Sequence, residues 1–180
     1  MTLYTVLIQN RVAATNSDYL NRSAIAGSSV NLDNGNVFRL DSQSTTTGQT
    51  EVWDVSATGS GLGDLWMAYS PEIVTVVSGT KKYRGIDPDP QDFYNVGALV
   101  FDAYKPQKGD IITMTAEAFT GTAASAYANS GSSVYTLHWA AAQASGALSY
   151  RYLATTYISR ADGAIDDQRV TAYKLECINN

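Results

Sequence analysis

Residues 170–178, "VTAYKLECI", decide the fold class, because apolar and polar side chains alternate along them. Tyr173, Leu175 and Cys177 fall on one side of an extended chain, and the lysine and glutamate between them fall on the other. A period of two is typical of a β-strand with one face on a core and one face toward water or a partner. The sequence therefore predicts a strand over these residues.

The same alternation recurs in residues 134–140, "VYTLHWA", and in residues 110–119, "DIITMTAEAF". Other segments are rich in the β-branched and aromatic residues that suit a pleated surface. They are residues 3–9, 36–42, 50–56, 64–70, 72–78, 97–104 and 148–158. No segment has the apolar spacing of a long amphipathic helix. The sequence predicts an all-β fold, an antiparallel barrel or sandwich of about nine short strands with at most short helical turns.

Three polar stretches are predicted to connect these strands. "DNGN" at residues 33–36 is a tight-turn signature, because Asn-Gly tolerates positive φ. Residues 121–133 carry too many Ser, Asn and Gly for a helix and are expected to form a loop or a short frayed turn. Residues 10–29, "NRVAATNSDYLNRSAIAGSS", form a long polar connection, and we expect residues 11–29 to be an arm that orders on assembly.

The composition limits the class of protein. With 180 residues and 44% apolar residues, we expect one domain over residues 1–180, with a boundary conceivable near Asp87 where "DPDP" interrupts the strands. Charged residues make up 16%, below the usual figure of about 25%, so the surface is mostly neutral and polar. Such a surface suits a protein that packs against neighbours.

The charge and the apolar runs exclude two kinds of partner. The net charge is −5 and the twelve Lys and Arg residues are scattered, so no basic patch for nucleic acid is expected. No run of apolar residues approaches the roughly 18 needed to cross a membrane. The N-terminal "MTLYTVLIQN" resembles a strand more than a signal peptide, and we expect synthesis in a cytoplasm.

The acidic segment at residues 86–93, "IDPDPQDF", has three interpretations: a structural corner, a calcium loop or part of a catalytic pair. Asp89, Pro90 and Asp92 fit an N-cap, a first helical position and a first-turn acid, which favours the corner. The prolines stiffen a segment that a calcium loop would need to bend. The aspartates of residues 161–167 are expected to face solvent in a turn, and calcium remains the alternative at both places.

Few residues are suited to catalysis. His138 is the only histidine, alternation places it on the polar side of a strand, and no G-x-S-x-G motif accompanies it. Cys177 is the only cysteine, so no internal disulfide can form, and a buried thiol is favoured over a reactive one. Carboxylates that could still pair across a sheet are those of Glu51, Glu72, Glu117 and Glu176. We expect no catalytic residue, metal or cofactor, and therefore no enzyme.

The aromatic residues favour a binding role. Twelve Tyr and three Trp residues suggest a wet protein interface or a sugar platform, since both use rings with a polar tip. The tryptophans lie within apolar strand segments and are expected to pack in the core. The candidate interface residues lie near loops, strand ends and the polar arm. They are Arg11, Tyr19, Arg22, Tyr83, Tyr127 and Tyr150.

Several stretches together resemble small virion structural proteins of tailed bacteriophages, of the head decoration or capsid-stabilising type. They are "NRVAATNSDY", "VWDV", "DLWMAYSPE", "YRGIDPDPQDF", "YKPQKGDIITMTAEAF" and "TTYIS" with "QRVTAYKLE", and they extend over nearly the whole chain. These motifs are strands and turns without chemistry of their own, so the resemblance implies no catalytic residue.

The resemblance implies a subunit on the capsid surface that binds the major capsid protein in many copies, often as a dimer or trimer. Its acidic charge would keep it from binding packaged DNA. Two alternatives remain open at this point. One is a carbohydrate-binding or adhesin module on the virion, and the other is a neck or tail component.

Overall fold

The structure is a computed structural model that describes residues 4–11, 18–45, 51–59, 64–78, 81–86, 90–131, 135–160 and 168–180. The predicted all-β fold is confirmed, since these residues form strands β1 to β14 and, apart from them, only short 3-10 turns. The strands are more numerous than the roughly nine expected from alternating segments. Several of them are too short to produce a visible alternation, such as β5 (Trp66–Ala68) and β10 (Phe119–Thr120).

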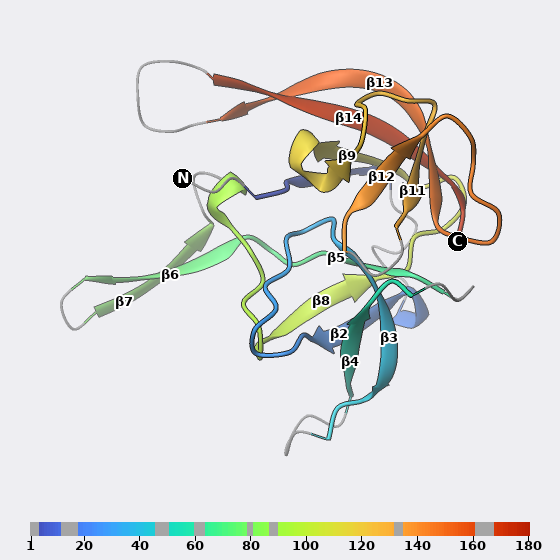
Figure 1. Ribbon diagram of the computed structural model, residues 1–180. Coiled ribbons are helices and arrows are strands. Elements are labelled where there is room, and N and C mark those ends of the chain that lie inside the picture. Colours follow the sequence, from blue (N-terminus) through green and yellow to red (C-terminus); the bar gives the residue numbers. More distant parts are fainter. Residues whose placement is uncertain are drawn as a thin grey trace.

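A seven-stranded sheet forms one layer (Figure 1). Its strands, in spatial order, are β1 (Leu7–Arg11), β9 (Ile111–Thr115), β14 (Gln168–Asn179), β13 (Ser149–Arg160), β11 (Tyr127–Ser130), β12 (Leu137–Ala140) and β10. All neighbours are antiparallel except β10 and β12, which are parallel. The long strand β14 lies between β9 and β13, so the segment with the clearest alternation is central.

A closed five-stranded barrel lies beside the sheet. Around the barrel the order is β2 (Asn21–Ile25), β4 (Val52–Ala57), β3 (Val37–Gln43), β5 and β8 (Val100–Tyr104). Only β2 and β4 are parallel. The remaining strands, β6 (Ile73–Ser78) and β7 (Lys81–Ile86), form a separate hairpin. The 3-10 turns are η2 (Asp18–Leu20), η3 (Pro90–Asp92) and η4 (Ala116–Ala118).

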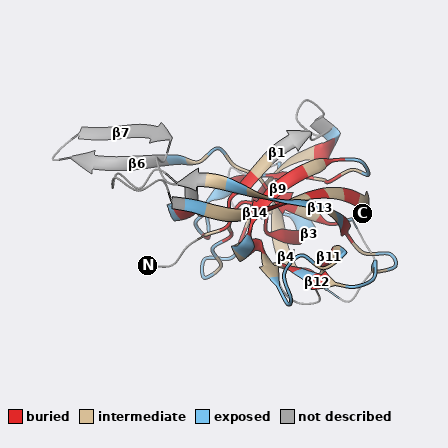
Figure 2. Cartoon of the chain, turned by 90° about the horizontal axis from the view of Figure 1, so that it is seen from above, coloured by how far each residue is buried: buried red, intermediate tan, exposed pale blue. Residues whose placement is uncertain are grey.

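One hydrophobic core joins the sheet to the barrel. Met114 and Leu175 of the sheet lie in the same buried cluster as Val37, Met67 and Tyr104 of the barrel. Figure 2 shows the buried residues concentrated where these strands overlap. The aromatic residues of the sheet add edge-to-face contacts, which stabilise beyond the area they bury.

A smaller cluster fills the barrel itself. Phe38 and Phe101 meet edge to face, with ring centroids 5.6 Å apart, above the small side chains of Ala24 and Ala103. Small residues on β2 and β8 let those two strands approach within a narrow barrel. Alternation of apolar and polar residues is hard to detect in such a strand, because alanine and serine differ little in hydrophobicity.

Two predicted connections are therefore wrong. Residues 10–29 do not form a free arm, because their second half contains β2, a wall of the barrel. Residues 121–133 contain β11, in which Ala128 is fully buried. The polar side chain of Asn129 is satisfied inside the sheet, donating to Ala142 O at 3.0 Å and accepting from Ser149 Oγ at 2.8 Å.

The tight turn at residues 33–36 is confirmed and holds the barrel against the sheet. Asn36 N donates to Asp33 O at 3.0 Å, and Gly35 has a φ of 96°. A Cβ at Gly35 would lie 2.9 Å from Met114 Sδ and 3.3 Å from Thr5 Cγ2. Only glycine provides both the left-handed backbone and the close approach.

Alanine substitutions at Gly35 and at Gly109, the matched control, separate the cost of the left-handed backbone from the cost of the close approach. Gly109 has a φ of 95°, but a Cβ there would meet nothing within 4 Å. Gly109→Ala should lower the free energy of unfolding by about 1 kcal/mol through backbone strain alone. Gly35→Ala should cost roughly 1–3 kcal/mol more because it also overpacks the core. Urea denaturation measures both losses, and equal losses would contradict the tight contact at Gly35.

Candidate functional site

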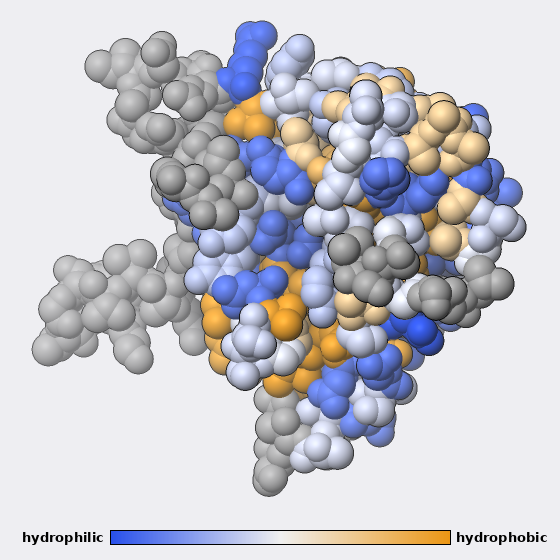
Figure 3. All heavy atoms as spheres, viewed as in Figure 1, coloured by the Kyte–Doolittle hydropathy of each residue, from blue (hydrophilic) through white to orange (hydrophobic). Residues whose placement is uncertain are grey.

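An apolar groove lies where the chain leaves the barrel for the β6–β7 hairpin. It has a volume of about 310 Å³ and is lined by Ser70, Pro71, Ile73, residues 93–96 and residues 99–102. Ile73, Val96, Leu99 and Val100 line it and leave 45–59% of their surface exposed. Figure 3 shows hydrophobic residues gathered on the lower left of the body. A contiguous group of exposed large apolar side chains marks a contact surface more often than single exposed residues do.

The loop that carries this groove is held in place by buried hydrogen bonds. Asn95 and Leu32 exchange backbone bonds of 2.7 and 3.0 Å, and Asn95 Nδ2 donates to Leu32 O at 2.9 Å. Gly97 N donates to Asn31 Oδ1 at 3.0 Å, and a Cβ at Gly97 would lie 2.6 Å from Gly27 O. The apolar side chains are thus exposed on a fixed backbone, which lowers the entropic cost of binding.

Two β-ribbons extend from the body, one formed by β6 and β7 and the other by the outer ends of β13 and β14 (Figure 1). Strands β6 and β7 pair only with each other among the described strands. The outer part of β13, residues 157–160, likewise pairs only with residues 168–171 of β14, because β9 pairs with β14 from Ala172 onward. Tyr157 on this ribbon is 60% exposed. Two-stranded ribbons are marginally stable alone in water, so these segments gain most from a partner surface.

The predicted interface residues belong to several different elements of the fold. Tyr19 in η2 is 71% exposed, and Tyr127 in β11 is half-buried. Arg22 lies in β2, where Nη1 donates to Asn21 O at 2.9 Å. Arg11 ends β1 and Tyr83 lies in β7, and the structure does not describe these two side chains.

Tyr150 is a core residue, so its prediction as a contact residue is wrong. It is the second residue of β13, lies opposite Cys177 of β14 and Ala128 of β11, and is fully buried. A position near a strand end favours exposure, but β11 and β14 flank Tyr150 on both sides and its ring lies in the hydrophobic core. The sequence predicts one strand over residues 97–104, whereas the strand begins at Val100. Leu99 therefore lies before the strand, and alternation gives no indication that it is exposed in an apolar groove.

The chemistry-bearing residues stay dispersed in the described part of the chain. No three His, Cys, Asp or Glu residues there are placed to hold a metal ion. Pro90–Asp92 forms a 3-10 turn, as predicted for a corner, whereas Asp87, Asp89 and residues 161–167 lie outside the described residues. His138 is exposed on β12, with Nδ1 3.1 Å from Thr120 Oγ1, which confirms a hydrogen-bonded histidine on a sheet surface.

Comparison with protein-family models, with curated proteins and with solved structures found no match to this chain. Within the described ranges, no helix is both long enough and apolar enough to cross a bilayer.

Burial gives three core residues a pKa above the ordinary range. The pKa of the Cys177 thiol is raised to about 12, first by burial and then by the charge of Asp110. Burial also raises the pKa of the phenols of Tyr104 and Tyr150. The native state therefore keeps these protons at a pH where the unfolded chain loses them.

This difference predicts alkaline destabilisation. Above the ordinary thiol pKa of 9.0 the unfolded chain binds fewer protons than the native state, so the free energy of unfolding should fall as the pH rises toward 12. Tyr150→Phe should make the fall less steep, because it removes one of the phenols whose pKa burial raises. Urea denaturation from about pH 8 to about pH 11 checks this, and a flat profile contradicts it.

Proposed function

We propose that the chain is a structural virion protein that binds the outside of a tailed-phage capsid as a decoration subunit. The observation that carries this proposal is the apolar groove, held on a fixed loop beside a hairpin whose strands pair only with each other among the described strands. Exposing apolar surface to water is unfavourable, and burying it against another protein lowers the free energy.

The groove and the ribbons support two modes of contact that act together. The groove, with Ile73, Val96 and Leu99, accepts apolar side chains of a partner. The free edges of β6 and β7 offer backbone N–H and C=O groups that can extend a partner's sheet. Each contact is small, and binding at many equivalent positions of a capsid lattice multiplies its effect through avidity.

The net charge supports a location on the outer surface of the capsid. A net charge of −5 at neutral pH favours separation from packaged DNA and disfavours binding to phosphate groups. The major capsid protein is the proposed partner. The resemblance of the six sequence stretches to decoration proteins supports the same assignment, and assembly as a dimer or trimer belongs to the same proposal.

A pair of charged substitutions in the groove tests the proposal. Val96→Asp/Leu99→Asp adds two negative charges to exposed positions, so the fold should survive and binding should weaken at least tenfold, about 1.4 kcal/mol. Occupancy is measured by co-sedimentation with capsids of the encoding phage that lack the chain. Quantitative mass spectrometry of intact particles should count copies on the order of hundreds.

Two control variants separate the groove from net charge. Leu99→Met keeps the groove apolar and should bind like the wild type. Lys108→Glu changes the net charge by the same amount at an exposed position away from the groove. The proposal fails if the double variant keeps full occupancy, or if particles hold only a few to a dozen copies, as expected for a neck or tail component.

A further inference from the structure

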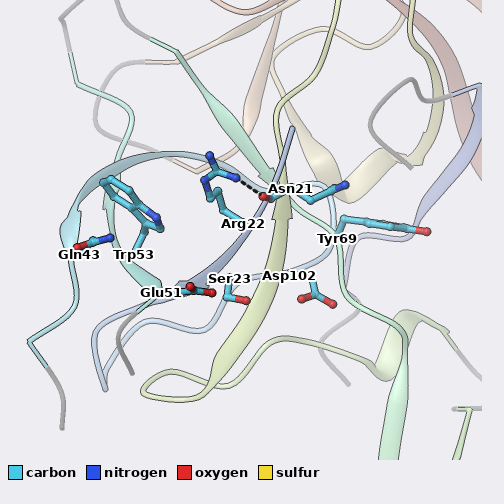
Figure 4. Close-up of a pocket in the computed structure, with 8 residues that line it drawn as sticks. All are labelled: Asn21, Arg22, Ser23, Gln43, Glu51, Trp53, Tyr69 and Asp102. Carbon is cyan, nitrogen blue, oxygen red and sulfur yellow. Dashed lines mark hydrogen bonds between the residues drawn. The ribbon is translucent and has the colours of Figure 1, made fainter. Parts of the chain in front are cut away.

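A second, polar groove lies at the end of the barrel where β2 and β4 begin and β3 ends. Its volume is about 760 Å³, large enough for two or more sugar rings. The lining residues are Asn21, Arg22, Ser23, Gln43, Glu51, Trp53, Tyr69 and Asp102. In Figure 4, Trp53 and Gln43 lie at one end, Tyr69 and Asp102 lie at the other, and Arg22, Ser23 and Glu51 lie between them.

The barrel explains why these side chains meet. Ser23 of β2 and Asp102 of β8 are directly paired across two antiparallel strands, so their side chains share one face. Gln43 of β3 is paired with Trp53 of β4, next to a register shift in β3 that follows Leu40. Such irregularities occur often at barrel rims, where they redirect side chains toward a binding site.

The groove combines an aromatic body with hydrogen-bonding groups of several kinds. Trp53 is half-buried, so part of its indole ring is available to a ligand. Glu51 and Asp102 supply carboxylate acceptors, Asn21 and Gln43 supply amides, and the remaining polar groups are a guanidinium and two hydroxyls. This mixture matches a ligand with an apolar face and many hydroxyl groups, which is the chemistry of a sugar ring.

The charges of the groove select against anions. Two carboxylates and one guanidinium line the groove, and Arg22 donates one hydrogen bond to Asn21 O. Partial burial raises the pKa of Asp102, so its carboxylate gains from a hydrogen-bond donor such as a hydroxyl. Phosphates, sulfated glycans and nucleic acids would add negative charge to a site that is already acidic.

We propose that this polar groove binds an uncharged saccharide, with Trp53 stacking on a sugar ring and Glu51 and Asp102 accepting hydrogen bonds from its hydroxyls. The groove shares only Asp102 with the lining of the apolar groove, and saccharide binding does not depend on capsid binding. The geometry is open, so affinity for one site falls in the range of about micromolar to millimolar.

The test is a glycan array probed with the full chain, followed by calorimetric titration of the strongest uncharged oligosaccharide. Trp53→Ala and Asp102→Asn should each weaken that binding at least tenfold. Tyr157→Ala, which removes an exposed ring outside the groove, should have no effect. Thermal melting checks that each variant folds. If Trp53→Ala does not fold, Asp102→Asn still tests the proposal.

The outcomes separate this proposal from its competitors. Retention of uncharged oligosaccharides that depends on Trp53 and Asp102 supports it. Failure to retain any uncharged oligosaccharide, retention of acidic glycans only, or binding insensitive to both variants overturns it. A lysine-rich peptide serves as a cationic probe, and binding of that peptide without any saccharide assigns the groove to basic peptides instead. Capsid occupancy of Trp53→Ala, whose side chain lines only the polar groove, is measured separately and shows whether the capsid proposal stands when saccharide binding is lost.

Discussion

The packing of the barrel against the seven-stranded sheet is the contact on which the rest of the structure depends. Tyr104 lies at this contact, fully buried, and its hydroxyl donates to Met67 Sδ at 3.4 Å. Each large side chain buried here contributes about 1.5–3 kcal/mol. Two residues earlier on the same strand, Asp102 reaches the surface and lines both grooves. The core therefore fixes where both candidate binding surfaces lie.

The two grooves differ in chemistry although they share a border. One side of Asp102 presents Leu99, Val100 and Ile73, and the other side presents carboxylates, amides and an indole. An apolar surface is suited to a permanent protein contact, and a polar open groove is suited to weak, repeated binding of a solvated ligand. A subunit attached through the first groove at many lattice positions would display the second groove in many copies, where weak affinity is sufficient.

The stability of the molecule is uneven in a way that fits this division. The sheet and the barrel bury their strands in common cores, whereas β6 and β7 pair only with each other among the described strands. A two-stranded hairpin is marginally stable alone in water, so this one gains stability when a partner surface covers it. The groove beside them is different, because Asn95 and Gly97 hold its loop through buried hydrogen bonds and a close backbone approach.

Much of the local structure followed from the sequence alone. The all-β class, the buried faces of residues 170–178, the surface position of His138 and the turn at Gly35 were predicted correctly. Each depends on a local rule: alternation fixes which side chains share a face, and Asn-Gly fixes a backbone region. These rules act over a few residues, so they hold wherever the segment is placed.

The partners of each strand were decided only by the tertiary structure. Strand β2 is a barrel wall because β4 and β8 pair with it, and Tyr150 is buried because neighbouring strands cover it. Both grooves join residues far apart in sequence: Gln43 and Asp102 in the polar groove, and Ile73 and Leu99 in the apolar groove. Exposure and proximity depend on which strands meet, and a periodicity of two contains no information about the neighbour.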